Sequence, residues 1–170
     1  ASIGAFSWIL IEWVRFGKPS LVGMVTGMVA GLATITPASG FVGVQGSIIL
    51  GTLGGIVCYV GVELVRIKLK IDDSLDVFAV HGVGGILGSL LVAVLALESF
   101  SGTGLSDGQT ASGQLYVQVL GVILVVVWTF VFTYIVLKIT SLFTPLRVEE
   151  DEEIEGLDLR SHGERSYFKD

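Results

Sequence analysis

The stretch PSLVGMVTGMVAGLATITPASGFVGVQGSIILGTLGGIVCYVGV, residues 19–62, contains no charged side chain. Two further uncharged runs follow it, at residues 77–97 and 108–137. A helix needs about 20 mainly apolar residues to cross the hydrocarbon core of a bilayer, so runs of this length indicate membrane spans. The alternative is a soluble domain that buries all three runs. A mean hydropathy of +0.80 disfavours it.

The 44-residue run at 19–62 is about twice as long as one span requires, so we expect it to fold back on itself. The sequence TPASG at 36–40 marks the break, because Pro ends a helix and Gly and Ser favour a turn. The predicted fold class is therefore an all-α polytopic membrane protein. Its expected helices are 1–14, 20–36, 44–65, 77–97 and 115–139, followed by a polar segment at 141–170.

The first predicted helix, 1–14, is too short to cross a bilayer. We therefore expect the chain to begin inside a helix and to be part of a longer protein. The single cysteine, Cys58, excludes a disulfide framework and a cysteine-based metal site. With 52% hydrophobic and 15% charged residues, the composition also excludes a disordered chain and a nucleic-acid binder.

The basic residues all fall on one side of the predicted membrane. The ten Lys and Arg are Arg15, Lys18, Arg66, Lys68, Lys70, Lys138, Arg147, Arg160, Arg165 and Lys169. By the positive-inside rule this side is cytoplasmic, so we expect a multi-pass protein of the cell membrane with a cytoplasmic C-terminal segment. Glu12 and Glu63 precede Arg15 and Arg66 by three positions, which predicts two local ion pairs.

Glycines recur every four residues in the apolar runs. They are Gly23, Gly27 and Gly31, then Gly51 and Gly55, then Gly84 and Gly88. Such spacing places small residues on one helix face, where a neighbouring helix can approach closely. The pattern predicts a tightly packed helix bundle and says nothing about what the protein carries.

His81 is the one ionisable residue well inside a predicted span. An ionisable group at that depth is by default a candidate for function. The alternative is a histidine that only hydrogen-bonds across a helix contact. A metal site is disfavoured because no second His, Cys or carboxylate lies three or four positions away, and no nucleophile or acid–base constellation indicates an enzyme. We therefore expect no metal and no cofactor.

Three motifs in this order resemble the ammonium transporter (Amt/Mep/Rh) family. The first runs from Gly17 to Gly43 and includes AGL at 30–32 and TPASG at 36–40, the second is DVFAVHGVGG at 76–85, and the third is EGLDLRSHGER at 155–165. The resemblance covers nearly the whole chain. It implies the C-terminal part of an eleven-helix bundle, helices seven to eleven, with the remaining helices of the same protein as partners.

The resemblance also implies a function and roles for single residues. His81 matches a pore histidine and Val77 an apolar wall position of a hydrophobic conduit for ammonium or ammonia. Asp73 matches a carboxylate at a helix end, and Thr26 and Thr36 match buried hydroxyl positions with a structural role. Family members are homotrimers in the lipid bilayer, and they are transporters rather than enzymes.

The C-terminal segment carries the third motif. Its recurrent positions are Gly156, Leu157, Asp158, His162, Gly163 and Glu164. The resemblance implies a regulatory tail that responds to a PII-type signal protein, whereas its net charge alone would indicate only a solvated acidic extension. A second function also stays open, in which the protein is an ammonium sensor that signals through this tail to a partner protein.

The predicted topology is testable by cysteine labelling. We expect a cysteine at Ser39 to react from outside the cell and one at Ser74 to react from the cytoplasm, because the charge-free and Lys-rich connections lie on opposite sides. The measurement is reaction with a membrane-impermeant thiol reagent in intact and permeabilised cells. Equal labelling of both positions from one side would contradict the topology.

Overall fold

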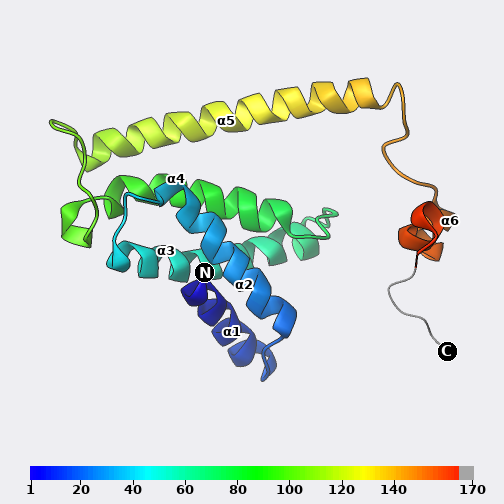
Figure 1. Cartoon of the computed structure of the whole chain (residues 1–170), viewed down its shortest axis with the longest axis horizontal. Helices are drawn as coiled ribbons and strands as arrows, with labels where there is room; N and C mark the ends of the chain where they lie inside the picture. The colour runs from blue at the N-terminus through cyan, green and yellow to red at the C-terminus, as the bar shows by residue number, and fades with distance from the viewer. Residues whose placement is uncertain (165–170) are drawn as a thin grey trace. The chain divides into compact units, whose positions relative to one another are not determined.

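The computed structural model describes residues 1–164, which are helical and contain no β-strand (Figure 1). The α-helices are α1 Ser2–Phe16, α2 Leu21–Ile35, α3 Val44–Val62, α4 Val83–Leu95, α5 Ala111–Thr140 and α6 Glu150–Glu155. Short 3₁₀ helices occur at η1 Thr36–Ala38 and η4 Glu98–Phe100, and π-helices at η2 Glu63–Lys68, η3 Val77–Gly82 and η5 Asp158–His162. Residues 1–123 form one compact unit, and the described residues from Leu124 onward form another.

Glycines bring α1, α2 and α3 together in the first unit. Gly23, Gly27 and Gly31 of α2 are all buried, as the four-residue spacing predicts. A Cβ atom added to Gly55 of α3 would lie 2.8 Å from the carbonyl oxygen of Gly4 in α1. The backbones are therefore in direct contact, which only residues without a side chain allow.

Thr34 occupies the point where α2, α3 and α4 meet. Its side chain is fully buried, and its hydroxyl donates a hydrogen bond of 2.8 Å to the carbonyl of Ala30. A Cβ added to Gly54 of α3 would lie 2.9 Å from the Cβ of Thr34, and one added to Gly84 of α4 would lie 3.0 Å from its hydroxyl oxygen. Glycines of both neighbouring helices thus make room for this threonine.

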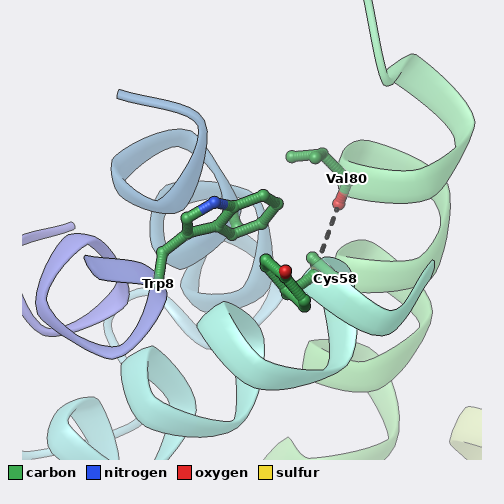
Figure 2. Close-up of a cluster of buried hydrophobic side chains, with 5 residues drawn as sticks. Trp8, Cys58 and Val80 are labelled. Atoms are coloured by element: carbon green, nitrogen blue, oxygen red, sulfur yellow. Dashed lines mark hydrogen bonds between the residues drawn. The ribbon is translucent and has the colours of Figure 1, made fainter. Parts of the chain in front are cut away.

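Two apolar clusters fill the remaining space in the first unit. One consists of Trp8, Ala30, Cys58, Tyr59 and Val80, and the other of Ala38, Leu50, Val92, Leu95 and Ala96. In the first cluster the Trp8 and Tyr59 rings meet edge to face with centroids 5.1 Å apart. Figure 2 shows Trp8 of α1, Cys58 of α3 and Val80 of η3 converging on this cluster.

The connection between α2 and α3 follows the prediction. The helix narrows into η1 at Thr36–Ala38, where Pro37 stands in the first turn, and Gly40 takes a left-handed conformation with φ 85°. α3 then begins at Val44. The π-helices at the ends of the next two spans were not predicted, because their longer hydrogen-bonded turns leave no distinct hydrophobic period.

Four helical stretches are long and apolar enough to cross a membrane, among the residues that the structure describes. They are Leu21–Ala38, Val44–Lys68, Val77–Leu95 and Ala111–Thr140. α1, with 15 residues, is shorter than a span, as expected for 1–14. α5 buries none of its 30 residues, so its apolar side chains are open to lipid or to other helices. The chain is an all-α polytopic membrane protein.

The close packing at Thr34 is testable with a pair of glycine variants in α4. A Cβ at Gly88 would overlap the carbonyl oxygen of Thr34, whereas one at Gly85 meets nothing within 4 Å. We expect Gly88→Ala to lower the free energy of unfolding in mixed micelles by about 1–3 kcal/mol through overpacking. Gly85→Ala is the matched control, and we expect it to be neutral or to stabilise by up to about 1 kcal/mol. Equal effects of the two variants would contradict this packing.

Candidate functional site

The candidate site lies on η3, the π-helix that leads into α4. One side of η3 is buried, with Ala79 and Val80 exposing 0% and 2% of their surface. On the other side Val77 is 53% exposed, and His81 is exposed as well. His81 and Val77 are therefore together on the side of η3 that the described residues leave open. Within residues 1–164 the imidazole has no hydrogen-bond partner.

Asp73 holds the N-terminus of η3. One carboxylate oxygen accepts a hydrogen bond from the N–H of Val77 at 2.7 Å, and the other accepts from Phe78 at 3.0 Å and Ala79 at 3.2 Å. The first N–H groups of a helix have no partner within the helix, and a negative charge there is favoured by the helix dipole. Asp73 thus satisfies the backbone at the start of the segment that carries His81.

Cys58 contacts the same segment from α3. Its thiol donates a hydrogen bond to the carbonyl oxygen of Val80 with a sulfur–oxygen distance of 3.6 Å, drawn as the dashed line in Figure 2. Cys58 is fully buried. Gly61 of α3 lies beside Ala79 and leaves space for this close approach, since a Cβ there would be 3.2 Å from the Ala79 carbonyl oxygen. The sequence did not indicate this contact, because Cys58 and Val80 are distant along the chain.

The described residues alone do not bury Thr26 and Thr36, which were expected as buried hydroxyl positions. Thr36 is exposed and Thr26 is half-buried, as is Asp73. The hydroxyls of Thr26 and Thr36 donate to Val22 and Leu32 one turn earlier in their own helix. The buried hydroxyl is that of Thr34. Because successive helical residues are about 100° apart, Thr36 points nearly opposite to Thr34, away from α3 and α4.

The two predicted local ion pairs are also wrong. Arg15 forms its ion pair with Glu63 of η2, and its guanidinium donates to the Tyr59 hydroxyl at 3.1 Å. Arg66 pairs with Asp76 at 3.4 Å. Helix packing brings these charges together across helices, which spacing within one helix does not reveal.

Glu12, the other carboxylate of the predicted local pairs, holds the start of α2. It accepts hydrogen bonds from the Ser20 N–H at 2.6 Å and from the Trp8 indole at 3.3 Å. The Ser20 hydroxyl in turn accepts from the Gly23 N–H at 2.8 Å and caps α2. This group joins α1 to α2 at the end of the bundle where Arg15 and Glu63 meet.

The tail residues are in a short folded element within the second unit. Gly156 and Gly163 both have positive φ angles, 101° and 67°, and bracket η5. Arg160 of η5 pairs with Glu152 of α6 at 3.3 Å. Leu157, Asp158, His162 and Glu164 are exposed. The element therefore has a defined shape while most of its motif side chains stay accessible.

A cavity of about 490 Å³ lies between the beginning of α1 and the facing parts of α2 and α3. Its walls include Ile3, Gly31, Ile35, Ser47 and Gly51. It includes neither His81 nor Val77. The described residues contain no group of three or more His, Cys, Asp or Glu that could hold a metal ion.

Comparison with known proteins gives the same family along the whole chain. Residues 1–167 match the model of the Ammonium Transporter Family. The chain is 42% identical over 169 residues to an ammonium transporter of Bacillus subtilis and 44% identical over 169 residues to the ammonium transporter Amt1 of Archaeoglobus fulgidus. Each alignment covers 98% of this chain and 42% of the relative.

The solved structure of a sensor Amt protein matches with a TM-score of 0.82 at 30% identity, over 93% of this chain and 38% of that one. The chain thus spans less than half the length of these relatives. The family model and the similar relatives both match nearly the whole of this chain, and the chain belongs to the Ammonium Transporter Family.

Proposed function

We propose that the protein to which this chain belongs transports ammonium or ammonia across the cell membrane through a hydrophobic conduit lined by His81. The observation that carries the proposal is the placement of His81, the sole ionisable side chain of residues 77–97, on the open side of η3. Relatives named as ammonium transporters support the substrate.

The surroundings of His81 suit a small polar cargo. Val77 and Phe78, at 53% and 59% exposure, give the open side of η3 an apolar character. An imidazole offers one hydrogen-bond donor and one acceptor, so it binds ammonia or ammonium without a fixed negative charge. A carboxylate at this point would attract other cations as well, because a fixed negative charge does not discriminate among them. His81 therefore contributes selectivity, while Val77 forms an apolar wall.

The same proposal includes the partners of this chain and its place in the cell. Three partners cover the apolar surface of α5 and the open side of η3 in this proposal. They are lipid, the remaining helices of the same protein and further copies in a homotrimer. We place the protein in the cell membrane with the segment from residue 141 in the cytoplasm, on the side of the Lys and Arg residues. Neither an enzymatic step nor a cofactor is part of the proposal.

The tail is proposed to regulate transport by binding a PII-type signal protein. Its support is the folded element around Gly156 and Gly163, with the side chains of Asp158, His162 and Glu164 exposed. Sensing is the second candidate function, favoured by the structural similarity to a sensor Amt protein. In that case the bundle would bind ammonium and signal through the tail to a partner.

Substitution of His81 tests the conduit. In the whole protein we expect His81→Ala to lower the selectivity for ammonium over potassium by about tenfold, the equivalent of one lost hydrogen bond. His81→Asp should admit other cations, because a fixed negative charge attracts them without discrimination. The measurement is uptake in proteoliposomes, with native electrophoresis to verify assembly. Normal, selective transport by an assembled His81→Ala variant would refute the pore assignment.

Removal of the tail tests regulation. We expect deletion of residues 155–170 to change the transport rate and abolish binding of a PII-type protein, while the bundle stays folded because its packing lies in residues 1–123. The measurements are transport, pull-down and thermal melting. If transport and partner binding are both unchanged, the segment is only a solvated extension. Ammonium binding without transport, together with binding of a partner by the tail, would favour the sensor.

A further inference from the structure

The segment that carries His81 is held in a rare helical form. Residues Val77–Gly82 form a π-helix, and the N–H of Val83 donates to the carbonyl of Phe78, five residues earlier. A π-turn contains one residue more than an α-turn and persists only where its surroundings stabilise it. Side chains before and after such a turn differ in direction by about 100° from their directions in a continuous α-helix.

Two groups outside η3 hold this form. The Asp73 carboxylate binds three successive N–H groups, those of Val77, Phe78 and Ala79. The Cys58 thiol binds the carbonyl of Val80. The Val80 carbonyl also accepts from the Val83 N–H, so the buried thiol is a second donor to it, from a different helix. One group acts at the start of the turn and the other near its end.

We propose that Asp73 and Cys58 are positioning residues for His81, which keep residues 77–82 in the π register so that Ala79 and Val80 face the bundle while Val77 and His81 face the conduit. The inference rests on the proposed function. Without these contacts, residues 77–82 would relax to an α-helix. Val77 and His81, four residues apart, would stay on one side but would turn together relative to α4. The effect would then be on selectivity, which depends on where the imidazole points.

The test uses the whole protein in proteoliposomes, with ammonium uptake compared with potassium conduction. We expect Asp73→Ala to lower the selectivity for ammonium by about tenfold or more, since it removes hydrogen bonds to a charged acceptor. Asp72→Ala is the matched control, because the Asp72 carboxylate accepts a hydrogen bond of 2.8 Å from the Ser74 hydroxyl rather than from the backbone of η3. It should retain the selectivity of the unmodified protein.

Cys58 gives a second pair of variants. We expect Cys58→Ala to lower selectivity and Cys58→Ser to restore it, because serine keeps a donor for the Val80 carbonyl. Cys58→Ser behaving like Cys58→Ala would contradict a role for the hydrogen bond. This pair decides the question if Asp73→Ala does not assemble.

Two further readouts separate positioning from mere stability. A structure of Asp73→Ala or Cys58→Ala should show residues 77–82 as α-helix, and retention of the π register would overturn the proposal. A lower melting temperature with unchanged selectivity would show that the residue is only structural. The His81→Ala variant separates failure of the proposed conduit from failure of the positioning role. If His81→Ala transports selectively, the proposed conduit is wrong. If His81→Ala loses selectivity but the Asp73 and Cys58 variants keep it, only the positioning role is wrong.

Discussion

Contact between backbones at Thr34 sets the arrangement of the bundle. Its fully buried side chain lies against Gly54 of α3 and Gly84 of α4, and its own carbonyl lies against Gly88. In a membrane, helices gain little from hiding apolar surface from one another, so close van der Waals packing and internal hydrogen bonding decide their association. The Thr34 hydroxyl meets the second condition by donating to Ala30. Once α2, α3 and α4 meet here, the position of η3 at the start of α4 is fixed.

The consequence of this packing is that one side of η3 is buried and the other is open. Ala79 and Val80 contact α2 and α3 and the cluster around Trp8, which leaves His81 on the opposite side. N–H groups of η3 donate to the Asp73 carboxylate, and the Cys58 thiol donates to the carbonyl of Val80, so the irregular turn has partners outside its own backbone. The same contacts that satisfy the backbone direct the imidazole. Packing, backbone hydrogen bonding and site geometry are therefore parts of one arrangement.

Charge is concentrated where the helices end. Arg15 with Glu63 and Arg66 with Asp76 form ion pairs close to the ends of α1 and α3, and the α6–η5 element contains its own pairs, such as Arg160 with Glu152. Charges in these places avoid the cost of entering hydrocarbon, and the imidazole of His81 is the one titratable side chain in residues 77–97. The chain is similar both to relatives named as ammonium transporters and to a sensor Amt protein, and a shared fold alone does not decide between these two uses.

The sequence by itself determined the fold class, the approximate positions of the long apolar helices, and the family. These conclusions rest on local or compositional features, which can be recognised from the sequence alone. The features are the long uncharged runs, the break at Pro37 and the distribution of Lys and Arg. The sequence also singled out His81 and Asp73, through depth in a span and a matching motif. It did not identify Thr34 as the buried threonine, the partners of Arg15 and Arg66, or the bond between Cys58 and Val80. Each of these depends on which face a helix turns toward its neighbours and on residues distant in the chain. Only tertiary packing fixes that rotation, because an apolar run carries almost no amphipathic signal to show which side is inside.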